Sequence, residues 1–138
     1  MRQPIVIIED DPDDLEIITI ALHNAGYQGE TVWFPHGEEA LRYLETTEDH
    51  PSIIFSDINM HVMNGLELRR KINTSTYLKE KSIPFVFLTT NASKQVIQEA
   101  YDLTVQGLFI KPDSLKEMQQ LISSVLNYWQ KCKHPNRP

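Results

Sequence analysis

Short apolar runs alternate with segments of helical periodicity along this chain, and the alternation repeats five times. The runs are apolar at consecutive positions, which is typical of strands covered on both faces of a parallel sheet. Strand and helix in regular alternation predict an α/β domain with right-handed crossovers. The five runs are residues 5–8, 31–34, 53–55, 85–88 and 108–110.

The segments between the runs place their apolar residues on one helical stripe. Pro12 and Gly26 mark the start and end of the first helix, and Asn64 with Gly65 opens the third. Residues 73–82 are expected to form a polar connection, and residues 133–138 a frayed tail after a domain that spans 1–132. The clearest stripe is in the last helix, at Leu115, Met118, Ile122, Val125 and Trp129.

Length and charge exclude several classes of function. The 138 residues allow one domain, and 13 basic against 19 acidic side chains give a net charge of −6. An acidic chain lacks the basic face that binding to a nucleic-acid duplex requires. The apolar runs are too short to span a membrane or to form a signal peptide, so a cytoplasmic protein is expected. The single Cys132 excludes an internal disulfide and a cysteine-based metal cluster.

Acidic side chains follow two of the predicted strands. Glu9 and Asp10 come directly after the first strand, and Asp57 follows the third. The carboxyl ends of parallel strands meet at one edge of an open sheet, where ligands bind. Two carboxylates about 5 Å apart repel by about 3 kcal/mol at an effective dielectric constant of 20, so the cluster needs a cation. Oxygen donors without Cys or a close His pair favour Mg²⁺.

Two further polar residues end neighbouring strands. Lys111 follows the fifth strand, where its ammonium group can pair with Asp57 or with a phosphoryl oxygen. A carboxylate beside Mg²⁺ can act as a nucleophile and form an aspartyl phosphate. Thr89 could donate its hydroxyl group to that phosphoryl group. Asp13 and Asp14 are interpreted only as favourable charges at a helix N-terminus.

Four motifs in order resemble the receiver domain of bacterial two-component response regulators. They are the residue stretches 5–12, 56–65, 87–90 and 110–112, and the resemblance covers essentially the whole chain. It implies a doubly wound, flavodoxin-like fold with five parallel strands in the order 2-1-3-4-5. It also implies a signalling protein, not an enzyme, that accepts a phosphoryl group from a histidine kinase or a histidine phosphotransfer protein.

The same resemblance assigns roles by motif position. Asp57 corresponds to the phosphoacceptor, Asp10 to a direct Mg²⁺ ligand, and Glu9 to a ligand acting through water. Asn59 would bind the metal through its main-chain carbonyl group. Thr89 corresponds to the switch hydroxyl and Lys111 to the phosphoryl-binding lysine, whose bond to Pro112 is cis in the family.

Two positions depart from the family pattern. His61 replaces the usual proline of the acceptor loop and is interpreted as an exposed side chain rather than a metal ligand. Leu108 replaces the aromatic residue that swings inward when the threonine binds phosphate. Phe109 is adjacent but should face the other side of the sheet. Phosphorylation is therefore expected to persist, whereas this chain lacks the aromatic side chain that usually transmits the signal.

The late Trp129 and the long connection before Pro84 resemble single-domain regulators that partner bacterial phytochrome-type kinases. No output domain is expected after Lys111, so we expect the signal to leave through a partner surface. Leu121 and Tyr128 widen the apolar stripe of the last helix. We expect this face, with Tyr101, to form a homodimer or to dock a kinase; a wide core face with an exposed tyrosine explains the pattern equally well.

Three other functions can be compared with this one. A flavin-binding electron carrier would need a phosphate-binding loop after the first strand, and the five acidic residues among positions 9–14 would repel the phosphate. A Mg²⁺ phosphohydrolase would carry a second aspartate two residues after the nucleophile, where this chain has Asn59. A receiver-like interaction module that works without phosphorylation remains the alternative, because Leu108 departs from the family pattern.

Overall fold

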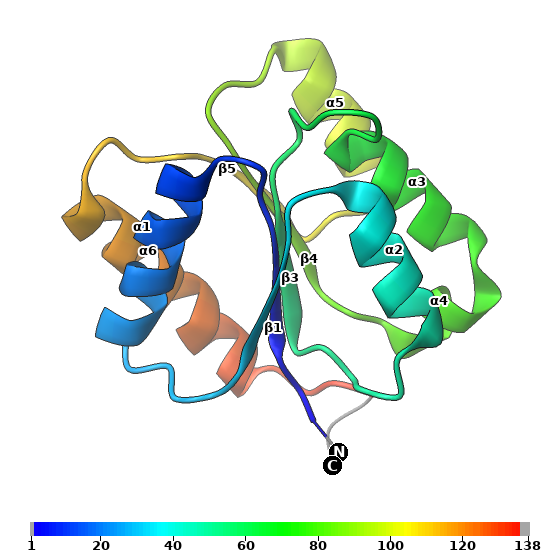
Figure 1. Cartoon of the computed structure of the whole chain (residues 1–138), viewed down its shortest axis with the longest axis horizontal. Helices are drawn as coiled ribbons and strands as arrows, with labels where there is room; N and C mark the ends of the chain where they lie inside the picture. The colour runs from blue at the N-terminus through cyan, green and yellow to red at the C-terminus, as the bar shows by residue number, and fades with distance from the viewer. Residues whose placement is uncertain (1, 136–138) are drawn as a thin grey trace.

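The computed structural model describes residues 2–135 as one parallel sheet between two layers of helices (Figure 1). The five strands lie in the order β2-β1-β3-β4-β5, so the predicted fold class and strand order are confirmed. The strands are β1 (Ile5–Ile8), β2 (Thr31–Phe34), β3 (Ile53–Ser56), β4 (Phe85–Thr89) and β5 (Gly107–Ile110). The helices are α1 (Pro12–Asn24), α2 (Gly37–Thr46), α3 (Gly65–Thr74), α4 (Thr76–Lys81), α5 (Lys94–Asp102) and α6 (Leu115–Lys131).

The sheet separates two apolar cores. Helices α1 and α6 cover one face, and α2 to α5 cover the other (Figure 1). Side chains alternate between the faces along each strand, so Val6 and Ile8 pack in one core while Ile5 and Ile7 pack in the other. Consecutive apolar residues in β1, β3 and β4 are therefore all buried, as the sequence predicts.

The two edge strands differ from that prediction. Thr31 and Trp33 of β2 are exposed, and so is Ile110 of β5. Each edge strand has a neighbour on one side only, so helices cover it incompletely. The expectation of burial on both faces therefore holds for the three inner strands and not for the edges.

A short helix, α4, occupies most of the stretch 73–82 that the sequence suggested was a polar connection, and α3 extends into the start of that stretch. Ser75 caps it by accepting a hydrogen bond from the Leu78 N–H at 3.2 Å, and Leu78 is buried. Lys81 Nζ donates to the main-chain carbonyl groups of Thr47 and Asp49 at 3.1 and 3.0 Å. The prediction was wrong because a six-residue helix with one apolar anchor shows no detectable periodicity.

The predicted boundaries of α1 and α3 agree with the structure. The Asp11 side chain caps α1, Pro12 is its first residue, and Gly26 follows its end with φ of +90°. Asn64 caps α3 by accepting a hydrogen bond from the Glu67 N–H at 2.9 Å. These caps set where each helix leaves the edge of the sheet that carries the acidic residues.

The expected frayed tail is only partly covered by the structure. His134 lies against Trp129, with 5.3 Å between the ring centroids. Its Nε2 atom is 3.1 Å from the Trp129 carbonyl oxygen. Residues 136–138 of the expected tail lie outside the described residues. Among the residues that are described, no helix has the length and apolar character needed to cross a membrane.

Candidate functional site

The carboxyl ends of β1, β3, β4 and β5 bring the predicted site residues to one edge of the sheet. Glu9 and Asp57 follow strands that pair in register, with Ile8 opposite Ser56. The Asp57 N–H donates to the Ile8 carbonyl group at 2.9 Å, which continues the pairing into the site. The Lys111 N–H donates in the same way to the Thr89 carbonyl group at 2.7 Å.

Three acidic side chains form a tight cluster at this edge. Glu9, Asp10 and Asp57 each place a carboxylate oxygen within 4.8 Å of the other two. Glu9 and Asp57 are buried, whereas Asp10 is half-buried. Sequence position alone predicted this grouping, because the loops that carry the three residues leave adjacent strands at the same end.

The ammonium group of Lys111 lies in the middle of the carboxylates. Its Nζ atom is 2.6 Å from Glu9 Oε1, 2.8 Å from Asp14 Oδ2 and 3.1 Å from Asp57 Oδ2. The interpretation of Asp14 as a helix-terminal charge alone was therefore wrong. Asp14 and Lys111 are 97 positions apart, and no local sequence signal marks that contact.

Burial and opposite charge shift the pKa values of the site in a connected way. Burial raises the pKa of Glu9 to about 7, and the Lys111 ammonium group opposes that rise. Burial acts to lower the pKa of Lys111, but hydrogen bonds to Asp14 and Glu9 outweigh it and raise that pKa well above its ordinary value. Lys111 is therefore a permanent cation, while Glu9 gains or loses a proton near neutral pH.

Main-chain groups orient the Asp57 carboxylate. Its Oδ1 atom accepts hydrogen bonds from the N–H groups of Ile58 at 2.7 Å and Asn59 at 3.3 Å. The loop is held close to the start of α3, because the Gly65 N–H donates to the Ile58 carbonyl group at 2.8 Å. A Cβ atom on Gly65 would lie 2.3 Å from the Asp57 carbonyl oxygen, so only glycine fits there.

Thr89 is fully buried beside the cluster. Its Oγ1 atom accepts a hydrogen bond from Asn59 Nδ2 at 3.4 Å and donates to the Asn91 carbonyl group at 3.3 Å. The hydroxyl group is thus engaged with the loops after β3 and β4. Both contacts are long, so a stronger acceptor could displace them at little cost.

Trp33 supports the site from the edge strand, and no local sequence pattern indicated this role. Its Nε1 atom donates to the Glu9 carbonyl oxygen at 2.8 Å. The Asp11 N–H donates to Glu9 Oε2 at 3.2 Å, so Glu9 is held at both its main chain and its side chain. An exposed tryptophan on an edge strand is a detectable signal only after the strand order is known.

Both positions that depart from the family pattern lie where the sequence predicts. Leu108 packs in the core below α2 to α5, and Phe109 packs in the opposite core, as predicted. His61 is exposed and lies outside the acidic cluster, also as predicted. The next residue, Val62, is exposed with φ of +67°. The expected cis bond between Lys111 and Pro112 is wrong, because no peptide bond within residues 2–135 is cis and the trans form is the usual ground state.

The donor set suits a hard divalent cation. Three carboxyl groups contact one ammonium group, and a fourth, that of Asp10, lies beside two of them. Among the described residues, no Cys or His belongs to the cluster. No N–H group in residues 2–135 donates to the main-chain carbonyl group of Asn59, so that oxygen is available as a further ligand. Carboxylate and carbonyl oxygens together are the ligands that Mg²⁺ prefers.

Comparisons with known proteins agree on one family. The model of the response regulator receiver domain matches residues 5–123. The chemotaxis protein CheY1 of Helicobacter pylori is 28% identical over 122 residues, which are 88% of this chain and 95% of that protein.

Two solved structures are similar over nearly the whole chain. The phosphorylated cyanobacterial phytochrome response regulator RcpA has a TM-score of 0.87 and 27% identity, and the match covers 99% of this chain and all of that one. The bacteriophytochrome response regulator RtBRR has a TM-score of 0.78 and 30% identity, over all of this chain and 84% of that one.

Proposed function

Because the chain belongs to the response regulator receiver family, we propose that it accepts a phosphoryl group on Asp57 from a histidine kinase or a histidine phosphotransfer protein. The observation that carries this proposal is the 3.1 Å contact between Lys111 Nζ and Asp57 Oδ2 inside a cluster of carboxylates. Phosphoryl transfer to aspartate requires a nucleophilic carboxylate beside a cation that can stabilise charge on the phosphoryl oxygens. The proposed receiver domain spans residues 1–132.

We propose that Mg²⁺ binds to Asp10, Asp57 and the Asn59 carbonyl group, with Glu9 acting through a water molecule. The ion would neutralise charge on the transferred phosphoryl oxygens. Glu9 lies deepest in the site and contacts Lys111, which is consistent with an indirect role. Asp14 contacts the same ammonium group from the solvent side and is the third carboxylate that pairs with Lys111.

The transfer step uses this chain's own groups at each atom. One Asp57 oxygen attacks phosphorus, and the bond from phosphorus to the donor histidine nitrogen breaks as that nitrogen keeps the electron pair. Lys111 exchanges its Asp57 contact for a phosphoryl oxygen. The Thr89 hydroxyl group leaves the Asn91 carbonyl group and donates to another phosphoryl oxygen. The protein is a phosphoacceptor with at most slow self-dephosphorylation, not a turnover enzyme.

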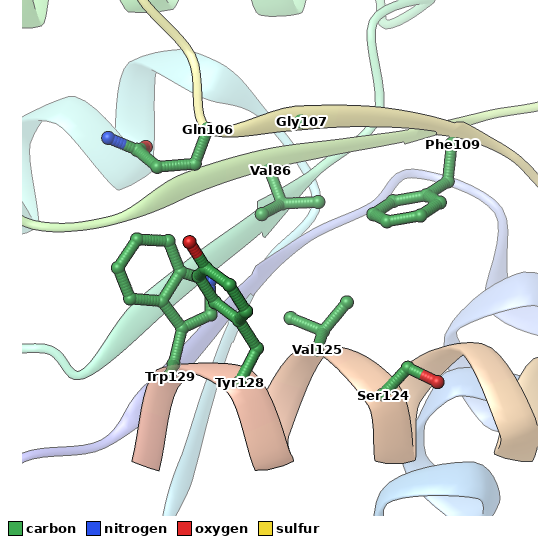
Figure 2. A pocket seen from close by; sticks show the side chains of 8 residues that line it. All are labelled: Val86, Gln106, Gly107, Phe109, Ser124, Val125, Tyr128 and Trp129. Carbon is green, nitrogen blue, oxygen red and sulfur yellow. The ribbon is translucent and has the colours of Figure 1, made fainter. Parts of the chain in front are cut away.

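Output through a partner surface fits the apolar edge beside β5. A hollow of about 340 Å³ lies between β5 and α6. Figure 2 shows Phe109 from the strand facing Val125, Tyr128 and Trp129 from the helix. Tyr128 is 65% exposed. We propose that this face forms a homodimer or docks the kinase. RcpA is a cyanobacterial phytochrome response regulator and RtBRR a bacteriophytochrome response regulator, which supports a phytochrome-type kinase as the partner.

The alternative is an interaction module that works without phosphorylation. It is favoured by one observation: Leu108, which packs against the core below α2 to α5, stands where the family usually has an aromatic residue. Binding of a partner with equal affinity to phosphorylated and unphosphorylated protein would select this alternative.

The test is incubation with acetyl phosphate and Mg²⁺, followed by intact and peptide mass spectrometry. We expect one base-labile phosphoryl group on Asp57 that requires Mg²⁺. The Asp57→Asn variant is the control and should gain none. No phosphoryl group on the wild-type protein, with Mg²⁺ binding measured independently, would contradict the proposed function.

A further inference from the structure

Arg69 of α3 is a buried cation outside the acidic site. It is only 8% exposed, and burial lowers the pKa of its guanidinium group from the ordinary value. Its Nε and Nη2 atoms donate to the carbonyl groups of Leu103 and Thr104 at 3.2 and 3.3 Å. The Phe85 ring centroid lies 5.2 Å from the guanidinium carbon. No carboxylate in residues 2–135 pairs with Arg69, so its charge faces neutral groups only.

The contacts of Arg69 use only part of its hydrogen-bonding capacity. A guanidinium group has five N–H donors, and two nitrogens supply the bonds to the end of α5. Asn73 Nδ2 donates to the same Leu103 carbonyl oxygen at 2.9 Å, so that carbonyl group already has a neutral donor. Capping the end of α5 therefore does not by itself account for burying a full positive charge at this place.

Arg69 lines a hollow of about 290 Å³ between α3, α4 and the start of β5, which we term the Arg69 pocket. Lys79 of α4 adds a second cation, and Asn73, Thr104 and Gln106 add polar groups. The described residues that line the pocket include no Asp or Glu. Its walls thus carry net positive charge although the whole chain carries −6.

Apart from Ser82, the rest of the lining is apolar. Leu44 of α2, Ile72 of α3 and Leu78 of α4 contribute buried side chains. Pockets with mostly apolar walls and a few convergent polar groups are typical of sites for small molecules. Apolar walls together with a guanidinium group and an ammonium group in the same lining match a ligand with an apolar body and an anionic head.

We propose that the Arg69 pocket binds a small organic anion, whose carboxylate or phosphate group contacts Arg69 and Lys79 and whose apolar part lies against Leu44, Ile72 and Leu78. The pocket is built at the amino ends of β3 to β5, since Ile54, Ile83 and Gln106 line it. The acidic site is at the carboxyl ends of the same strands. The proposed ligand is therefore distinct from the phosphoryl donor, and its binding does not depend on phosphorylation of Asp57.

The test is nuclear magnetic resonance titration of the full chain in EDTA, with the Arg69 Nε–H signal as reporter. The probes are benzoate and phenylphosphonate, which separate a carboxylate from a phosphate-like head, and benzamide is the uncharged counterpart of benzoate. We expect saturable shifts with a Kd of about 1 mM or tighter for at least one of the two anions. Benzamide should bind at least tenfold more weakly than benzoate if benzoate is the anion recognised.

Three variants identify the residues responsible. Arg69→Met should weaken binding at least tenfold, read from the amide signals of the pocket. Lys79→Met should weaken it severalfold and, because Lys79 is exposed, should leave the fold intact. Arg70→Met is the matched control, since Arg70 is the next residue, pairs with Glu99 at the surface and lies outside the pocket.

Several results would overturn the proposal. One is the absence of saturable shifts with either anion. Another is equal weakening by Arg70→Met and Lys79→Met, which would indicate attraction by surface charge alone. Inorganic sulfate binding as tightly as both organic probes would show an adventitious ion only. In each case the proposed role of Asp57 would stand unaffected, because that role is tested separately.

Discussion

Individual hydrogen bonds to the main chain decide how the acidic site is held. Trp33 Nε1 donates to the Glu9 carbonyl group at 2.8 Å, which anchors the end of β1 just before Asp10. The edge strand β2 thus positions two proposed metal ligands without contacting the metal itself. Hydrogen bonds that hold metal ligands in place in this way tune the affinity of a site for its metal.

The Trp33→Phe variant tests this positioning role. Phenylalanine keeps an aromatic ring on β2 but lacks the N–H donor, so we expect the affinity for Mg²⁺ to fall severalfold, measured by calorimetry. The melting temperature should change little, because Trp33 is already 46% exposed. Phosphorylation at saturating Mg²⁺ should recover to the wild-type rate. Unchanged affinity would show that the indole only covers the sheet edge.

The raised pKa of Glu9 predicts a dependence of stability on pH. In the folded protein without metal, the pKa is about 7 against an ordinary value of 4.5, so folding favours the protonated form. The stability that protonated Glu9 contributes to the folded state is fully present below about pH 4.5 and is lost as pH rises through about 7. Glu9→Gln mimics the protonated form and should not show this loss.

We therefore expect the free energy of unfolding of the wild type to fall relative to Glu9→Gln by about 1 to 3 kcal/mol between pH 5 and 8 in EDTA. Chemical denaturation at several pH values measures the difference. Saturating Mg²⁺ should reduce the gap, because a bound cation favours ionised Glu9. If the free energies of unfolding of the two proteins changed in parallel with pH in EDTA, the raised pKa of Glu9 would be contradicted.

At the scale of elements, the packing of α3 against β3 and β4 sets the shape of the acceptor loop. A Cβ atom on Gly65 would lie 2.3 Å from the Asp57 carbonyl oxygen and 2.7 Å from the Phe87 ring. We expect Gly65→Ala to lower the free energy of unfolding by about 1 to 3 kcal/mol and to slow phosphorylation of Asp57. The cause is displacement of the loop from the start of α3.

Gly107→Ala is the matched control for that substitution. Its added Cβ atom would meet only the Phe109 ring at 3.6 Å, an ordinary contact. Both stability and phosphorylation should stay close to those of the wild type. Denaturation and mass spectrometry after treatment with acetyl phosphate measure the two effects, and equal loss in both variants would exclude the proposed cause.

Elements with strong local patterns were predictable, and those defined by few residues were not. The three inner strands follow from consecutive apolar residues, and α6 follows from a stripe anchored by Met118, Ile122 and Val125. The short α4 depends on one buried leucine and on Lys81 bonding to two carbonyl groups far away in sequence. Contacts of this kind produce no repeating pattern of apolar residues in the sequence.

At the scale of the whole molecule, the same distinction applies to the site. Glu9, Asp57 and Lys111 were predictable because strand ends converge at one edge. Asp14 was missed because its contact with Lys111 depends on how α1 leaves the sheet, which no motif encodes. The order of the strands therefore determines the chemistry of the site, and loop geometry determines which additional charges join it.

The sheet also determines how a signal could leave the molecule. The edge at β5 is flanked by α5 and α6 on opposite faces, so Tyr101 and Tyr128 lie on helices on either side of the strand (Figure 1). Tyr128 sits beside the hollow between β5 and α6 (Figure 2). Leu108 of β5 pairs with Phe87 of β4, the neighbouring strand that ends in Thr89.

We predict that movement of Thr89 toward a phosphoryl group shifts β5 and strengthens association through α6. Sedimentation velocity with acetyl phosphate and Mg²⁺ should show a larger dimer fraction than without them. Asp57→Asn should abolish the difference, and Tyr128→Lys should reduce dimer formation under both conditions by placing like charges at the contact. A monomer at every concentration, with and without the phosphoryl donor, would contradict a dimer and leave the α6 face as a docking surface for the kinase.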